Sequence, residues 1–170
     1  MNNYPSWLPE MINIRGTWEE ISTLLYDVFE RDIKSGKLRF EGRHVWYDGT
    51  IEPGDKYEEG FWHLISQDIW KMQAGRKIKE RIFDEERARR LPWCAPTISN
   101  SKEPDVLVWD YKESTRRIRT YLWIKDYDYV IILEKKFMRK GEIAFLVTAF
   151  HVGGDFKRRD LSEKYQKRLN

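Results

Sequence analysis

His63 lies in the run EEGFWHLIS, between bulky aromatic and aliphatic residues and directly after an acidic turn that contains a glycine. A histidine in an apolar run is usually a packed, hydrogen-bonded core residue. Imidazole is also the side chain best matched to proton transfer near neutral pH, and rigid aromatic neighbours could hold it at the edge of a cleft. Both interpretations of His63 stay open from the sequence.

Two arginines that follow His63 offer positive charge for a phosphate. Arg87 and Arg90 belong to the segment RARRLPW and would share one face of a helix, where two guanidinium groups could clamp one phosphate. They could equally pair within the helix with the acidic residues 84–86. Lys136, at the end of a predicted strand, has the same two interpretations.

A hydroxyl and a second histidine come near the end of the last predicted strand. Thr148 stands among apolar residues, and His151 follows just beyond it. A threonine hydroxyl in a strand usually bonds to the backbone, but it could also donate to a phosphate oxygen. His151 is a candidate second proton carrier, ranked below His63.

The predicted strand over residues 116–124 has two different faces. Alternate residues of a strand point to opposite sides. One set belongs in a core against helices: Ile118, Thr120, Leu122 and Ile124. The other combines guanidinium and aromatic groups: Arg117, Arg119, Tyr121 and Trp123. This second set suits phosphate contact and base stacking on single-stranded RNA, unless neighbouring elements simply cover it.

These residues require an α+β frame. A capping box at Thr17 and Glu20 predicts a helix that Gly36 ends, and KLRF and HVWY predict a short hairpin. We expect a helix or turn over 62–70, and a charged helix from 74 that ends before Pro92. Four β-rich runs then predict an antiparallel meander, and a basic helix closes the chain. Their residues are 106–111, 116–124, 128–136 and 142–152.

Composition limits the class of protein. A chain of 170 residues fits one domain, which divides into 1–36, 37–100 and 101–170. One cysteine, Cys94, excludes an intramolecular disulfide and fits a reducing compartment, and three histidines make a structural zinc site hard to assemble. We see no signal peptide and no membrane span, so we expect a soluble cytoplasmic protein without a cofactor.

Charge is distributed unevenly along the chain. Residues 1–74 carry 8 basic and 13 acidic side chains, whereas residues 75–170 carry 23 basic and 15 acidic ones. The second half therefore has a net charge of +8 against −5 for the first. A basic half favours a polyanionic partner such as RNA, although an unevenly charged but ordinary surface is the alternative.

Four segments in order resemble one family of nucleases. EGFWHLIS, RARRLPW, IRTYLWIKDYDYVIILEKK and FLVTAFHV are together similar to the barnase–EndoU–colicin–RelE-like superfamily of small RNases, particularly its phage-borne and toxin-associated members. The resemblance covers about residues 38–168. It implies N-terminal helices packed on an antiparallel sheet, with the active site on the sheet face.

The resemblance also implies a chemistry and a set of partners. RNA would be cleaved without a metal, by attack of its 2′-hydroxyl to form a 2′,3′-cyclic phosphate. His63 would act as general base or acid, and Thr148 would orient the phosphate. Arg87 or Arg90, helped by Lys136, would stabilise the developing charge. An antitoxin or inhibitor protein is a further candidate partner; the oligomeric state stays open.

Two rival functions remain. Pro104-Asp105 and Glu134-Lys135-Lys136 match the short PD…ExK pattern of Mg²⁺-dependent nucleases, although a whole predicted strand separates the two parts. A non-catalytic RNA-binding or protein-interaction module, in which His63 is a core residue, is the other alternative.

Overall fold

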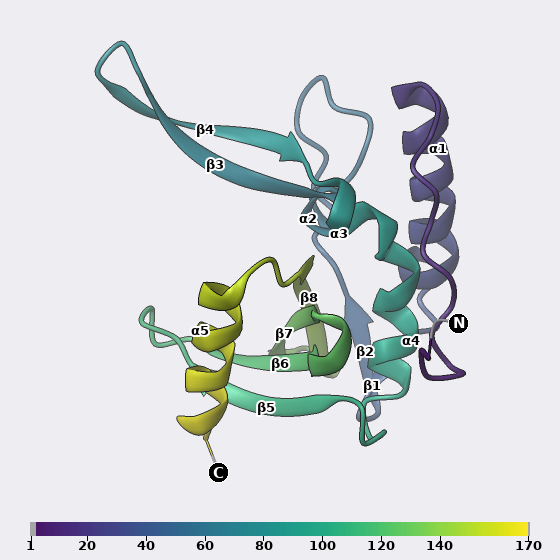
Figure 1. Ribbon diagram of the computed structural model, residues 1–170, viewed down its shortest axis with the longest axis vertical. Coiled ribbons are helices and arrows are strands. Elements are labelled where there is room, and N and C mark those ends of the chain that lie inside the picture. Colours follow the sequence, from purple (N-terminus) through teal and green to yellow (C-terminus); the bar gives the residue numbers. More distant parts are fainter. Residues whose placement is uncertain (1–2, 170) are drawn as a thin grey trace.

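The computed structural model describes residues 3–169 and shows an α+β protein (Figure 1). In this part of the chain five α-helices accompany a six-stranded mixed sheet and a separate two-stranded hairpin. The helices are α1 Trp18–Phe29, α2 Glu59–Ile65, α3 Glu85–Arg89, α4 Cys94–Ser99 and α5 Asp155–Gln166. The strands are β1 Arg39–Phe40, β2 Arg43–Trp46, β3 Ser66–Gln73, β4 Arg76–Phe83, β5 Leu107–Lys112, β6 Ile118–Ile124, β7 Tyr129–Met138 and β8 Gly141–His151.

The large sheet has the strand order β1-β2-β8-β7-β6-β5. Its antiparallel part, β5 to β8, confirms the four predicted C-terminal strands. The prediction of a pure meander is wrong, because β2 of the early hairpin adds to β8 in parallel, with His44 opposite Ile143. Two parallel strands need a long connection between them. Here residues 47–140, between the end of β2 and the start of β8, form that connection. The alternation of apolar and polar residues in a sequence indicates which face of a strand is buried. It does not indicate which other strand pairs with that strand at the edge of a sheet.

The predicted charged helix over 74–91 is also wrong. Residues 76–83 form β4, paired in antiparallel with β3, and only the short α3 follows. The turn between the two strands is Ala74-Gly75, and both residues have positive φ, +48° and +76°, as a tight hairpin turn requires. Lysine, arginine and glutamate have good helix propensity, so the charge pattern concealed the alternation of this strand.

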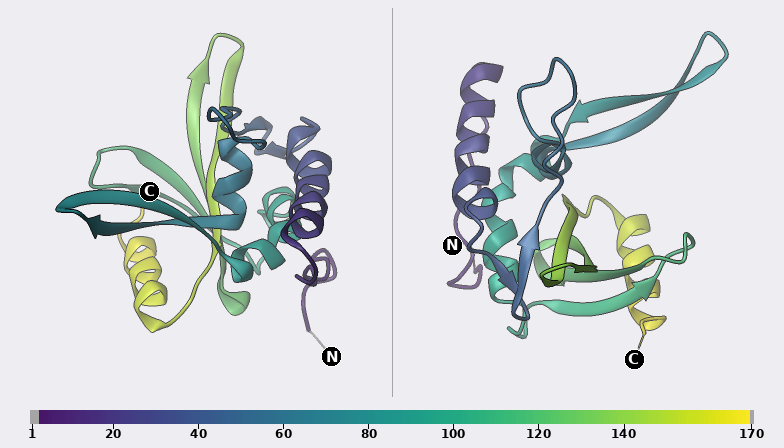
Figure 2. Two further views of the ribbon diagram at one scale, coloured as in Figure 1. Left: turned by 90° about the horizontal axis from the view of Figure 1, so that it is seen from above. Right: turned by 180° about the vertical axis from the view of Figure 1, so that it is seen from behind.

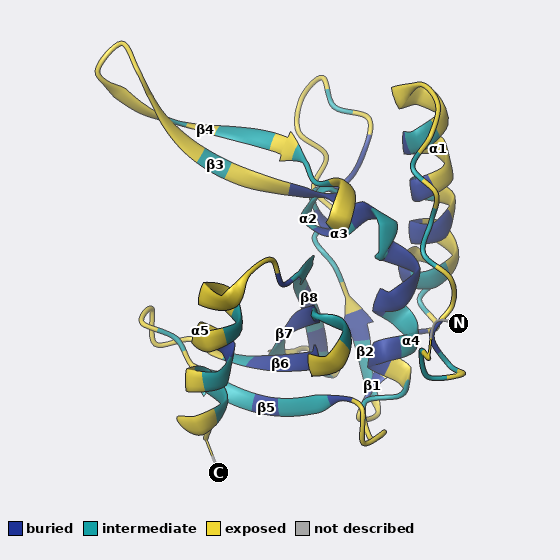
Figure 3. Ribbon diagram, in the orientation of Figure 1, coloured by how far each residue is buried: buried dark blue, intermediate teal, exposed yellow. Residues whose placement is uncertain are grey.

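The two faces of the large sheet are covered differently (Figures 2 and 3). The main core lies between one face and helices α1 to α4, and includes Phe29, Phe61 and Trp93. On the other face, α5 covers a second cluster of buried residues: Trp109, Tyr121, Trp123, Val130, Ile132, Val152 and Leu161. The prediction that Tyr121 and Trp123 stack on RNA bases is therefore wrong, because both rings are buried in this cluster.

The N-terminal helix forms as the sequence predicts. Thr17 accepts a hydrogen bond from the Glu20 amide, and the Glu20 carboxylate accepts one from the Thr17 amide. A π-helical turn continues α1 to Lys34, and Gly36 then reverses the chain with φ +76°. The predicted basic helix at the C-terminus is α5. No helix within residues 3–169 is long and apolar enough to cross a membrane.

Candidate functional site

His63 lies in α2, a short helix that packs closely against the loop before it. Phe61, Leu64 and Ile65 face the core, which leaves the His63 side chain at the margin with 35% of its surface exposed. The helix lies directly on the preceding loop, since a Cβ added at Gly60 would stand only 3.0 Å from the Asp48 carbonyl oxygen. His63 is thus neither fully buried nor mobile on a loop.

Arg87 and Thr148 meet at the backbone of His63. The Arg87 Nη1 donates to the carbonyl oxygens of His63 at 2.9 Å and Ser66 at 2.6 Å. The Thr148 hydroxyl donates to the same His63 carbonyl at 2.9 Å and lies 3.3 Å from Arg87 Nη1. The junction between α2 and β3 is therefore fixed to β8.

The sheet topology explains why β8 is free to hold this junction. Strand β2 pairs with β8 only at residues 143–145. The rest of that edge of β8 has no strand beside it within the described residues, and α2 and α3 pack there instead. Thr148 lies in this segment, beside a β-bulge at Ile132 and Leu133 of the β7–β8 pair.

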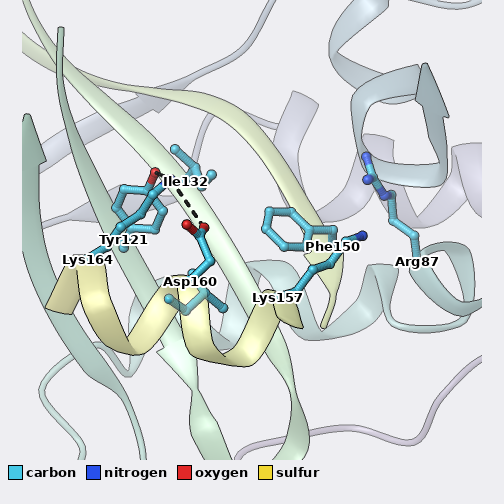
Figure 4. A pocket seen from close by; sticks show the side chains of 8 residues that line it. Arg87, Tyr121, Ile132, Phe150, Lys157, Asp160 and Lys164 are labelled. Carbon is cyan, nitrogen blue, oxygen red and sulfur yellow. Dashed lines mark hydrogen bonds and ion pairs between the residues drawn. The ribbon is translucent and has the colours of Figure 1, made fainter. Parts of the chain in front are cut away.

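Arg87 lines two cavities. The first, which we call the His63 cleft, has a volume of about 370 Å³. Its lining residues are His63, Ser66, Gln67, Asp68, Arg87, Val147 and Thr148. The second has about 240 Å³ and runs from Arg87 along Phe150 to Lys157, Asp160 and Lys164 of α5 (Figure 4). The two cavities together place three cationic groups around one stretch of sheet face.

The surroundings of His63 favour its neutral form. Burial lowers the pKa of His63, while the carboxylates of Glu59 and Asp48 oppose this shift and the Arg81 guanidinium adds to it. The Nε2 atom lies 3.7 Å from Glu59 Oε2, and Nδ1 is buried without a hydrogen-bond partner among residues 3–169. A neutral imidazole near neutral pH can accept a proton, and the Glu59 carboxylate would stabilise the cation that results.

Arg87 is held as a buried cation. Burial lowers its pKa, Asp84 opposes the shift, and guanidinium stays protonated in proteins. Its side chain is 13% exposed, with Nε 3.8 Å from Asp84 Oδ2, and its guanidinium lies over the Phe150 ring at 5.7 Å. Three acceptors orient Nη1, whereas Nη2 makes no hydrogen bond with any residue between 3 and 169.

Three predicted site residues do not join this group. Arg90 donates to the carbonyl and carboxylate of Glu86 and lies over Trp93, so it does not clamp a phosphate together with Arg87. His151 lies on the opposite face of β8 from Thr148, where burial and then Arg90 lower its pKa. Lys136 covers the Phe145 ring at 4.3 Å, four residues from the partner of Thr148 and thus about 13 Å along the strand.

The predicted RNA-binding strand is only partly accessible. Arg117 has 61% of its side chain exposed and Arg119 28%, and both approach Glu134 within 4.0 Å. They remain available at the far end of β6, whereas the aromatic members of the set lie beneath α5. Phosphate contact is compatible with this arrangement and base stacking on this strand is not.

The two parts of the PD…ExK pattern lie apart. Glu134 is paired with Arg119, which stands opposite Tyr111 in β5. Asp105 precedes β5 by two residues, so it lies about 20 Å away along the strand direction. Among residues 3–169 no group of three or more histidine, cysteine, aspartate or glutamate side chains could hold a metal ion.

Other residues of the site were not indicated by the sequence. Glu59 and Asp68 flank His63 through the folding of α2 into β3, and Lys157 reaches the site from α5. The (i, i+4) spacing of Glu59 and His63 was a usable signal for one pair. The position of Asp68 depended on recognising β3, and no local pattern indicated that Lys157 would face Arg87.

Comparisons with known proteins gave no match among protein-family models, curated proteins or solved structures. The function is therefore inferred from the residues themselves.

Proposed function

We propose that this protein is a metal-independent endoribonuclease in which His63 is the catalytic acid–base group. One observation carries the proposal: a half-buried imidazole with a lowered pKa shares a cleft with a buried, oriented arginine and a threonine that both bond to its backbone. A proton acceptor beside a fixed positive charge is what attack on a phosphodiester requires.

The reaction uses the substrate's own hydroxyl. His63 removes the proton of the 2′-hydroxyl, whose oxygen forms a bond to the adjacent phosphorus. The bond from phosphorus to the 5′-oxygen breaks, and that oxygen leaves with the electron pair and takes a proton from water. The products are a 2′,3′-cyclic phosphate and a free 5′-hydroxyl, and the imidazolium then returns its proton to solvent. Glu59, 3.7 Å from Nε2, stabilises the imidazolium while it exists.

Arg87 and Thr148 have different parts in this proposal. The Arg87 charge stabilises the negative charge that builds on the phosphoryl oxygens, and its Nη2 remains able to donate. The Thr148 hydrogen goes to the His63 carbonyl, so the hydroxyl acts as a positioning group and not as the phosphate donor that the sequence suggested. Lys157 and Lys164, on the α5 side of Arg87, attract the flanking phosphates.

The experiment that tests this function is cleavage of a defined RNA in the presence of EDTA. We expect cleavage to persist and to leave a 2′,3′-cyclic phosphate end, detected by mass spectrometry. A substrate with one 2′-deoxy nucleotide at the cleavage position should resist at that position. Loss of activity in EDTA, or cleavage of the deoxy substrate, contradicts the proposal and favours a metal-dependent nuclease.

A non-catalytic RNA-binding module is the second candidate. The observation in its favour is that Arg87 Nη1 and the Thr148 hydroxyl both bond to backbone carbonyls, as a purely structural network does. Such a module would bind RNA in a salt-sensitive way and leave it intact, and substitution of His63 would change neither property.

A further inference from the structure

The β3–β4 hairpin, residues 66–83, extends away from the body of the protein, and we call it the arm (Figures 1 and 2). Its strands make eight cross-strand pairs, from Ser66 with Phe83 to Gln73 with Arg76, and pair with no other strand between residues 3 and 169. Every residue from 70 to 77 is exposed (Figure 3). A two-stranded hairpin is only marginally stable by itself. Because residues 70–77 are exposed, packing in a core does not explain which side chains stand there.

One face of the arm combines an aromatic ring with lysines. Trp70 pairs with Lys79 and Met72 pairs with Lys77, so all four side chains point to the same side. Trp70 is 61% exposed and Met72 is 69% exposed. The Lys77 Nζ lies 5.0 Å from the centre of the Trp70 ring. A flat apolar surface is thus flanked by ammonium groups.

The charge of the arm has one dominant sign. Residues 66–83 contain five basic side chains and two acidic ones, Asp68 and Glu80. Glu80 is paired with Lys71 on the opposite face. On the Trp70 face, Lys79 pairs with Asp68 at 3.0 Å, at the base of the arm. An exposed apolar patch with positive charge marks a binding surface for a polyanion.

We propose that this face binds single-stranded RNA, with a base stacked on Trp70 and phosphates against Lys77 and Lys79. An acidic peptide would use the lysines but has no use for a flat ring, whereas base stacking on an aromatic ring with nearby cations uses both. The base of the arm, Ser66 to Asp68, also lines the His63 cleft, so a strand held there continues onto β3. The choice of RNA rests on the proposed function; binding to the arm does not require cleavage.

The test is the affinity of the full chain for a labelled 2′-O-methyl oligonucleotide of about 12 nucleotides, which cannot be cleaved, measured by fluorescence anisotropy. Trp70→Ala should raise Kd at least about fivefold, the lower end of what stacking on an aromatic ring contributes, and Trp70→Phe should retain most of the affinity. The double variant Lys77→Ala and Lys79→Ala should reduce the slope of log K against log salt by about 0.7 for each phosphate that the protein no longer neutralises.

Two controls come from the other exposed hairpin tip. Phe137→Ala removes an aromatic ring that is 87% exposed, and Lys140→Ala removes an exposed lysine; neither should change Kd or the salt slope. Far-UV circular dichroism and thermal unfolding establish that each variant is folded. Wild-type affinity in both Trp70→Ala and the double lysine variant overturns the inference. Equal displacement of the oligonucleotide by polyglutamate and by unlabelled RNA also overturns it, in favour of an acidic protein partner.

Failure of the arm and failure of the proposed function are distinguishable. If the wild type cleaves RNA with EDTA present while Trp70→Ala and the double lysine variant bind the oligonucleotide with wild-type affinity, the nuclease proposal stands and the arm inference fails. If the wild type cleaves no RNA while binding still depends on Trp70, the arm inference stands and the nuclease proposal fails.

Discussion

The Thr148 hydroxyl donates a 2.9 Å hydrogen bond to the backbone carbonyl of His63, 85 positions earlier in the chain. This bond, together with the two carbonyl contacts of Arg87, fixes the end of α2 against β8. The side chain of His63 is left to face the cleft. Its chemistry can therefore be tested separately from its anchoring.

Substitution of His63 tests the catalytic group. His63→Ala should keep the fold and lower the rate of RNA cleavage by about 10²–10⁴-fold, the usual contribution of a general acid or base. The measurement is single-turnover cleavage with EDTA present, alongside thermal unfolding. Normal cleavage by this variant, or its failure to fold, would instead make His63 a core residue. His151→Ala is the matched control, and we expect it to cleave normally.

Arg87 and Arg90 form a natural pair for comparison, because their side chains are similarly little exposed, 13% and 11%, and they lie three positions apart. Arg87→Ala should lower turnover by about 10²–10³-fold and destabilise the fold by about 1–3 kcal/mol, since it leaves carbonyl groups without a donor. Arg90→Ala loses the bonds to Glu86 and the contact with the Trp93 ring, none of which belongs to the His63 cleft, and should retain turnover, as should Lys140→Ala. Equal effects on turnover at all three positions would indicate that bulk charge alone matters.

Thr148→Val separates positioning from direct binding of the substrate. Valine keeps the shape of threonine and removes the hydroxyl, so we expect a loss of about 0.5–1.5 kcal/mol in stability and a fall in kcat of less than about tenfold. The KM for RNA should not change, because the hydroxyl already bonds to His63. A large rise in KM would assign Thr148 a direct phosphate contact.

The lowered pKa of His63 predicts how stability depends on pH. Burial makes the folded protein bind this proton less tightly than the unfolded chain does. The stability it contributes is complete above about pH 6.5, the ordinary value for histidine, and is lost as the pH falls from there through the folded-state pKa. His63→Gln should therefore lose less stability than the wild type between these two pH values, measured by urea denaturation. An identical pH slope in both proteins would contradict the shift.

A substitution at Gly60 tests how closely α2 packs against the preceding loop. A methyl group there would meet the Asp48 carbonyl oxygen at 3.0 Å and the Tyr47 side chain at 3.1 Å, so Gly60→Ala should cost about 1–3 kcal/mol instead of the gain that alanine usually gives in a helix. Gly153→Ala, where nothing lies within 4 Å, is the control. A neutral effect at Gly60 would mean that α2 shifts freely.

Local signals in the sequence predicted a large part of the fold. The capping box at Thr17 and the four C-terminal strands depend on short-range spacing, and both are confirmed. The arm was missed because its charged strand β4 has an amino-acid composition typical of a helix. The parallel pairing of β2 with β8 was missed because no residue pattern in either strand indicates it. For the same reason the burial of Tyr121 under α5 was not predictable: alternation assigns a face but not what covers it.

For the site as well, short-range patterns predicted some features and tertiary contacts determined the others. Residue types and chain order indicated His63, Arg87 and Thr148, and the structure brings these three together. The choice between Arg87 and Arg90 depended on where α3 ends, which short-range patterns locate poorly. The role of Thr148 depended on which acceptor lies beside it, and that acceptor belongs to a helix distant in sequence.

The parallel pairing of β2 with β8 and the bond from Thr148 to His63 have a consequence for biosynthesis. During translation the polypeptide emerges from its N-terminus, so a ribosome-bound chain that ends before residue 141 lacks the strand that fixes α2. The His63 carbonyl then keeps Arg87 as a donor but lacks the Thr148 hydroxyl, and the His63 cleft lacks the part of its wall that Val147 and Thr148 supply. Under the proposed nuclease function, the chain could therefore cleave RNA only after its final strand has left the ribosome.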